Sequence, residues 1–207
     1  VTGVQTCALP ILARMGRIGP MGRMAGLVWV GVALAARAWA GTLTVEVEPR
    51  FGGVPLVFDQ VAYTNAAGQA LSVTRLDFLL SGFGLKRADG TWQELSNQFA
   101  YVSLREGRNA FRLEDVPDEA FSALRLQVGL PSEINNGDPA RYPPEHPLNP
   151  NLNGLHWSWL GGYIFLALEG LWQAPDGKAQ GYSFHLATAR ELMHVEAPLP
   201  EIGRAHV

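Results

Sequence analysis

The stretch YIFLALEGLW at residues 163–172 is followed by the turn residues PDGK at 175–178 and then by GYSFHLA at 181–187. The first segment is almost entirely apolar and has the length of a strand. Asp, Gly and Pro between two such segments favour a tight turn, because each suits the backbone angles that a turn needs. The pattern therefore predicts an antiparallel β-hairpin.

The same kind of pattern extends outward from this hairpin. TLTVEVE at 42–48 and LRLQVGL at 124–130 alternate between apolar and polar residues, as half-buried strands do. Residues 71–85 also alternate, with interruptions at Gly82 and Gly84, and the sequence ADG at 88–90 predicts a further hairpin turn. Residues 117–123 fit a short helix. Many short strands with closely spaced turns predict an all-β fold, an antiparallel β-sandwich or barrel.

One long loop interrupts the strands at residues 131–154 and is rich in Asn, Pro and Gly. Loops of this length are unusual in compact domains and are often functional. Its segment NNGDP at 135–139 could offer oxygens to calcium, but it lacks the spacing and the terminal glutamate of an EF-hand loop. Turn formation explains these residues better, and the loop continues directly into the aromatic stretch GLHWSWLGGY at 154–163.

Both ends of the chain differ from its middle. Residues 1–12 and 201–207 resemble a sequencing-library adapter translated in frame, so we expect them to be adapter-derived artefacts. Residues 13–40 have basic residues, then an apolar run at 24–36, and end in Ala38-Trp39-Ala40, as a secretory signal peptide does. We expect cleavage near Ala40, a periplasmic or secreted protein, and one domain at 41–200. The apolar run is too short for a membrane span, which needs about 20 residues.

Composition excludes several classes of function. Residues 41–200 contain 11 basic and 18 acidic side chains, without basic clusters, which argues against nucleic-acid binding. The only cysteine, Cys7, lies in the adapter-like segment, so no thiolate is expected as a metal ligand or nucleophile. The sequence contains no Ser-His-Asp order, no HExxH and no phosphate-binding loop. We therefore do not expect an enzyme.

The predicted hairpin places His185 near the start of the strand that follows His156, so the two imidazoles could meet. Neutral imidazole binds copper, zinc, iron or nickel. Two histidines without a thiolate or a matching carboxylate favour a low-coordinate soft ion such as Cu(I) over structural zinc, which normally has four ligands. The alternative is that each histidine is an ordinary polar residue beside a loop.

Trp157 and Trp159 lie two positions apart and would share one face of a regular strand. They could be core aromatics, in which case the motif is purely structural and the protein is a structural partner of an exported complex. They could also be a stacking platform of a carbohydrate- or peptide-binding β-sandwich.

Several of these segments together resemble the MbnP family. The matching segments, in chain order, are RLDFLLSG at 75–82, INNGDP at 134–139, YP at 142–143, HPLN at 146–149, GLHWSWLGGY at 154–163, EG at 169–170 and GYSFHL at 181–186. The resemblance implies an exported, β-rich copper-binding protein. It also implies a partner, a di-haem protein similar to MauG and bacterial cytochrome c peroxidases (called MbnH), which oxidises a tryptophan to kynurenine.

Carried over to this chain, the resemblance makes His156 and His185 the candidate copper ligands and Trp157 or Trp159 the candidate for oxidation. Oxidation to kynurenine opens the pyrrole ring of the indole and leaves an aniline nitrogen, which is a weak donor. Two imidazoles and that nitrogen would form a low-coordinate site suited to Cu(I).

Overall fold

The computed structural model describes residues 11–13, 40–157 and 161–199. It is built mainly from antiparallel strands, and the longest is β6 (Ala70–Arg87). An eight-stranded sheet has the order β12-β11-β6-β10-β13, and β5, β7 and β8 also pair with β6. The prediction of an all-β, antiparallel fold is confirmed.

The remaining strands of that sheet are short or medium in length: β5 (Tyr63–Thr64), β7 (Trp92–Leu95), β8 (Ala100–Ser103), β10 (Phe121–Val128), β11 (Ile164–Gln173), β12 (Ala179–Ala187) and β13 (Met193–Pro198). A second sheet contains β1 (Ile11–Ala13), β2 (Ala40–Val47) and β9 (Ala110–Pro117), and β3 (Arg50–Phe51) pairs with β4 (Val54–Pro55). The backbone of β1 pairs with the end of β2, Ile11 opposite Val47.

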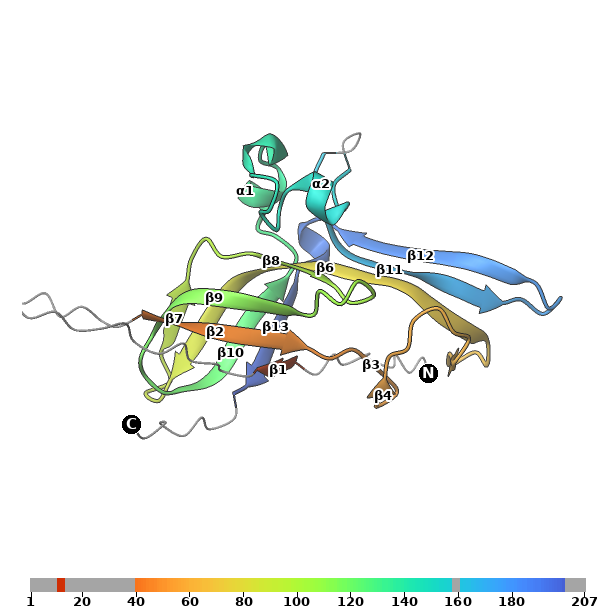
Figure 1. Ribbon diagram of the computed structural model, residues 1–207, viewed down its shortest axis with the longest axis horizontal. Helices are drawn as coiled ribbons and strands as arrows, with labels where there is room; N and C mark the ends of the chain where they lie inside the picture. The colour runs from red at the N-terminus through yellow and green to blue at the C-terminus, as the bar shows by residue number, and fades with distance from the viewer. Residues whose placement is uncertain (1–10, 14–39, 158–160, 200–207) are drawn as a thin grey trace, which may run out of the picture.

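Strand β6 belongs to two parts of the fold. Residues 80–87 pair with β10, and β2 and β9 cover this half as a second layer (Figure 1). Leu43, Leu113 and Leu124 are almost completely buried between the layers. Burial of one such side chain contributes about 1.5–3 kcal/mol. The main core cluster to which they belong continues along β6 into its other half, where it includes Phe78 and Leu76.

The other half of β6 pairs with β11, which in turn pairs with β12. These three strands extend to the right of the two-layer body in Figure 1, and we call them the arm. The predicted hairpin of residues 163–187 is therefore confirmed as β11 and β12. Near the start of the half that pairs with β10, Gly82 has φ of 59°. There β6 has one extra residue opposite β10, between the pairs Ser81–Gln127 and Gly84–Arg125, so the glycine permits a bulge and a bend.

The long loop at 131–154 is present, and it contains three short helices: α1 (Ser132–Asn135), the 3₁₀ helix η1 (Pro139–Arg141) and α2 (Pro150–Asn153). A last 3₁₀ helix, η2 (Ala189–Glu191), precedes β13. Within the described ranges no helix is long and apolar enough to cross a membrane. The expected signal segment at 13–40 lies almost entirely outside those ranges.

The predicted helix at residues 117–123 is wrong. Strand β9 continues to Pro117, a tight turn follows in which Glu119 N bonds Pro117 O, and β10 begins at Phe121. Phe121 packs against the main core as the first residue of a strand. Strands β9 and β10 belong to different sheets, so this short turn carries the chain from one layer to the other, and tertiary packing overrides the local helical tendency.

Candidate functional site

The arm has two chemically different faces. The pairs Ala167–His185 and Glu169–Ser183 join β11 to β12, and Ala167–Asp77 and Glu169–Arg75 join β11 to β6. Residues that pair directly share a face, and neighbours along a strand point to opposite faces. We call the set Arg75, Asp77, Glu169, Ser183 and His185 the polar face. The opposite set, Leu76, Phe78, Leu166, Leu168 and Phe184, is the apolar face.

The charged side chains of the polar face are connected in series. Asp77 Oδ2 lies 2.6 Å from Arg75 Nε, and an Arg75 terminal nitrogen lies 3.1 Å from Glu169 Oε1. The same Glu169 oxygen lies 2.7 Å from His185 Nε2. Ser183 Oγ is 3.1 Å from this nitrogen as well. His185 is therefore the end of a series of polar contacts that begins at the buried Asp77.

These contacts favour the charged forms of Glu169 and Arg75. The hydrogen bond with His185 holds the pKa of Glu169 below its usual value, and the charge of Arg75 acts in the same direction. Burial opposes the charge of Arg75, but the contacts with Asp77 and Glu169 raise its pKa above the ordinary value. Glu169 is consequently ionised at neutral pH and can only accept hydrogen bonds.

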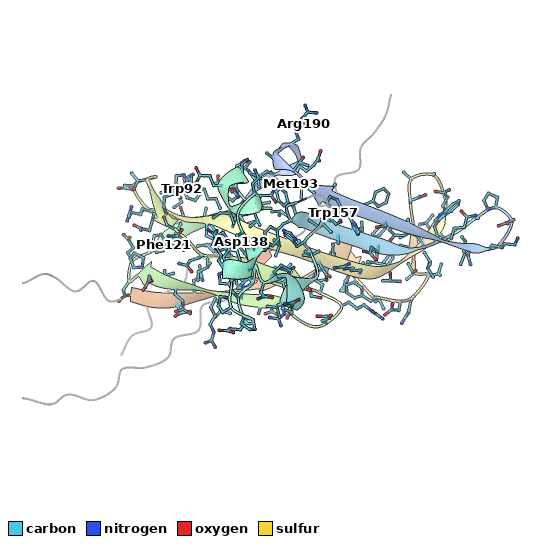
Figure 2. All side chains as sticks on the ribbon, turned by 90° about the horizontal axis from the view of Figure 1, so that it is seen from above. Trp92, Phe121, Asp138, Trp157, Arg190 and Met193 are labelled. Carbon is cyan, nitrogen blue, oxygen red and sulfur yellow. The ribbon has the colours of Figure 1, made fainter. Side chains whose placement is uncertain are left out.

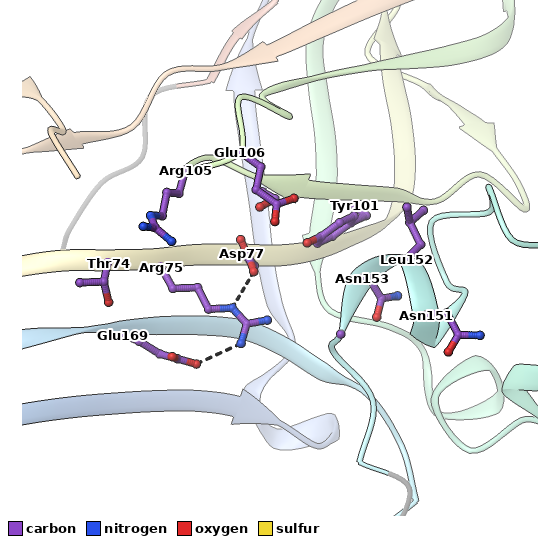
Figure 3. A pocket seen from close by; sticks show the side chains of 12 residues that line it. Thr74, Arg75, Asp77, Tyr101, Arg105, Glu106, Asn151, Leu152, Asn153 and Glu169 are labelled. Carbon is purple, nitrogen blue, oxygen red and sulfur yellow. Dashed lines mark hydrogen bonds and ion pairs between the residues drawn. The ribbon is translucent and has the colours of Figure 1, made fainter. Parts of the chain in front are cut away.

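A polar cavity of about 470 Å³ opens beside the polar face. Figure 3 shows the Arg75 side chain between Asp77 and Glu169, facing Tyr101 and the helix α2 residue Asn153. Burial raises the pKa of Tyr101, so this phenol is neutral at physiological pH. The cavity gives water or a small polar ligand access to the charged part of the face.

His156 lies in a tight hairpin that leads into β11. Ile164 N bonds Leu155 O at 2.8 Å and Trp157 N bonds Gly162 O at 3.0 Å, which places His156 opposite Tyr163. The two rings meet edge to face, with centroids 4.8 Å apart. Burial lowers the pKa of His156, so the imidazole is neutral at physiological pH.

Trp157 connects this hairpin to the polar face. Its ring centroid lies 6.2 Å from that of His185, and its side chain packs against a second core cluster that includes Leu155, Tyr163 and Ala167. Figure 2 shows Trp157 where the loop joins the arm. Trp159 lies outside the described residues. The structure thus brings His185 together with Trp157, and His156 with Tyr163.

The polar residues of the long loop hold the hairpin in place. Asn135 Oδ1 accepts a hydrogen bond from Tyr163 N at 2.8 Å, and the phenol of Tyr163 donates to Leu148 O at 2.7 Å. Asp138 and Asn149 cap η1 and α2 with their side chains. These are the contacts of turns and helix caps, in line with the turn interpretation of residues 135–139.

The other two histidines of the domain lie apart from the polar face. His146 stacks on Tyr142 with centroids 4.4 Å apart, and its Nδ1 accepts a hydrogen bond from Leu148 N. His194 is exposed on β13, opposite Gln127 of β10. Among the residues that the structure describes, neither contacts His185, so both serve as comparison sites for a metal.

The donors that are present fit a low-coordinate metal better than a four-ligand one. No group of three or more His, Cys, Asp or Glu side chains gathers around a possible metal position in the described part of the chain. The His156 imidazole forms no hydrogen bond with a described residue, and one nitrogen of His185 already contacts a carboxylate. A neutral imidazole and an imidazole held by a carboxylate are the forms in which histidine binds metals.

The sequence did not point to Glu169 and Arg75. A single glutamate on an apolar strand makes no recognisable pair, because Arg75 lies 94 positions earlier. A signal was nevertheless present: Arg75 and Asp77 both interrupt an apolar stretch at a spacing of two, which places them on the same face of one strand.

Comparison with known protein families identifies one match. The MbnP family model matches residues 40–206. A solved structure, MbnP from Methylosinus trichosporium, is similar with a TM-score of 0.55 and 15% sequence identity, covering 79% of this chain and 73% of that chain. No curated protein matches. The family model covers most of the sequence, and the chain therefore belongs to the MbnP family.

Proposed function

We propose that this protein is exported to the periplasm or beyond and binds Cu(I) through His156 and His185. The observation that carries the proposal is the setting of His185, whose imidazole is held by Glu169 at 2.7 Å and has the Trp157 ring beside it. The domain has no thiolate and a single thioether, Met193, so imidazole is the main donor available for copper. Membership of the MbnP family supports the same function.

The third ligand in this proposal is made from tryptophan. We take Trp157 as the candidate, because its ring lies 6.2 Å from the His185 ring. Two equivalents of peroxide would add two oxygen atoms across the C2–C3 bond of the indole, giving N-formylkynurenine and two waters. Hydrolysis then releases formate and leaves kynurenine with its aniline nitrogen. A di-haem protein similar to MauG is the proposed partner that activates the peroxide.

An anaerobic Cu(I) titration against a chromophoric chelator tests the binding site. We expect His156→Ala and His185→Ala each to weaken Cu(I) binding by at least about tenfold, the lower end of what loss of a ligand or its support costs. His194→Ala is the matched control and should leave the affinity unchanged. If all three variants bind Cu(I) as tightly as the wild-type protein does, the assignment of His156 and His185 is contradicted.

Peptide mass spectrometry of protein co-expressed with its di-haem partner tests the modification. The mass change of a tryptophan-to-kynurenine conversion is expected at Trp157, assigned from fragment ions that separate it from Trp159 in the same peptide. A conversion at Trp159 alone would refute the choice of Trp157. If copper does not bind and a glycan quenches tryptophan fluorescence instead, the protein is a carbohydrate-binding β-sandwich.

A further inference from the structure

The contact between His185 and Glu169 also bears on which imidazole nitrogen is available. Neutral imidazole has one N–H donor and one nitrogen with a free lone pair. His185 Nε2 lies 2.7 Å from Glu169 Oε1, which is hydrogen-bond distance for a charged acceptor. An ionised carboxylate cannot donate, so the hydrogen in this bond must come from Nε2.

Arg75 fixes the carboxylate that accepts this hydrogen bond. Its guanidinium contacts Glu169 Oε1 at 3.1 Å and is itself held by Asp77 at 2.6 Å. Asp77 is only 5% exposed and lies on the neighbouring strand β6. The Glu169 side chain is therefore held by Arg75 of β6 and by His185 of β12. A rotation of this side chain away from His185 would break both contacts.

We propose that Glu169, held by Arg75, keeps His185 in the tautomer protonated at Nε2, so that Nδ1 is the nitrogen that binds the metal. Glu169 and Arg75 are positioning residues in this arrangement. The proposal rests on the function proposed above for the metal, but its first part concerns the metal-free protein. Metal-bound histidines commonly donate their second nitrogen to a carboxylate, which orients the ring and strengthens the ligand.

The first experiment is a long-range ¹H–¹⁵N NMR spectrum of the metal-free protein with labelled histidine, recorded at about pH 8, where histidine is ordinarily neutral. We expect His185 to have a protonated Nε2 with a slowly exchanging proton and an unprotonated Nδ1. In Glu169→Ala that proton should exchange too fast to be observed, and Glu169→Gln, which keeps an acceptor oxygen, should retain it in part. A His185 protonated at Nδ1 would overturn the proposal, whether or not copper binds.

The second experiment adds Cu(I) to the same samples and measures affinity. The Nδ1 resonance of His185 should shift on binding, and Glu169→Ala should weaken binding by roughly tenfold to hundredfold. Glu196→Ala, which removes an exposed carboxylate of β13, is the matched control and should change neither result. If the Nε2 resonance of His185 shifts on binding and the Nδ1 resonance does not, this inference is contradicted, while the proposal that the protein binds copper still stands. Absence of any Cu(I) binding contradicts the proposed function alone, since the tautomer is decided in the metal-free protein.

Discussion

The two faces of the arm share one backbone and differ in almost everything else. On the polar face, Arg75, Glu169 and His185 form a connected series across three strands. On the apolar face, Phe78 and Leu166 face a groove of about 880 Å³ that Phe51 helps to line. A pleated sheet separates these environments by the thickness of one strand layer. The comparison teaches that alternate residues of the same strands can form a charged network on one side of a sheet and pack a core on the other.

The largest effect on stability is expected from Phe78, which is 2% exposed and belongs to the main core. Phe78→Ala should lower the free energy of unfolding by about 3–5 kcal/mol, because it removes buried surface and leaves a cavity. Chemical denaturation measures this loss. The copper bound per folded molecule should stay the same, and a loss of copper from the folded variant would show that the two faces are not independent.

A substitution at Gly170 tests how closely the backbone of the arm is packed at a position that both faces share. A Cβ added there would lie 2.0 Å from Ser72 O and 2.5 Å from the Tyr182 hydroxyl oxygen. Gly170→Ala should therefore destabilise the protein by about 1–3 kcal/mol, the usual cost of overpacking. Gly181→Ala is the matched control on β12, where a Cβ meets open space. Similar unfolding curves for the two variants would contradict the close approach at Gly170.

The buried phenol of Tyr163 makes the stability of the hairpin between the long loop and β11 depend on pH. Burial raises the pKa of Tyr163 to about 12, against an ordinary value of 10.0. The folded state therefore holds the phenol proton more tightly than the unfolded chain. The contribution of this buried phenol to the free energy of unfolding is fully present below pH 10 and is lost as the pH rises toward 12.

Tyr163→Phe isolates this contribution. At neutral pH the variant should lose about 1–3 kcal/mol, because the carbonyl of Leu148 no longer receives its hydrogen bond. Between pH 10 and pH 12 the stability of the wild type should fall more steeply than that of the variant. Urea denaturation at several pH values measures both quantities, and parallel pH profiles would refute the burial of the phenol.

The smallest effect is expected at the exposed edge of the apolar face. The Phe184 side chain is 60% exposed on β12, next to His185 in the chain. Phe184→Ala should change stability by no more than about 0.5 kcal/mol, as is usual for surface substitutions. It should also leave Cu(I) affinity unchanged. A marked loss of affinity in this variant would mean that the apolar face takes part in binding.

Much of this fold could be predicted from the sequence, because alternation and turn residues fix short-range structure. The hairpin at 163–187 followed from an apolar strand, an Asp-Gly turn and a return strand. Its register did not follow, since the bulge between Ile164 and Leu166 shifts the pairing. A shift of one residue moves every side chain to the other face. The pairing of His185 with Ala167 could therefore be learned only from the structure.

The candidate site was predictable only in part, for a similar reason. His185 and the His156-Trp157 pair could be recognised as chemically unusual residues near one hairpin. The contacts of Glu169 with Arg75 depend on a strand pairing between distant parts of the chain, which alternation alone does not specify. The incorrect helix at 117–123 illustrates the same limit, because packing of Phe121 decided the outcome.

Histidine NMR of the protein during a Cu(I) titration tests copper binding at the polar face most directly. The domain has four imidazoles, and those of His146 and His194 serve as internal controls because they lie apart from His185. The proposal predicts that the ring resonances of His185 and His156 change on addition of one equivalent of Cu(I), while those of His146 and His194 do not. Unchanged His185 resonances in protein that has bound copper would contradict it.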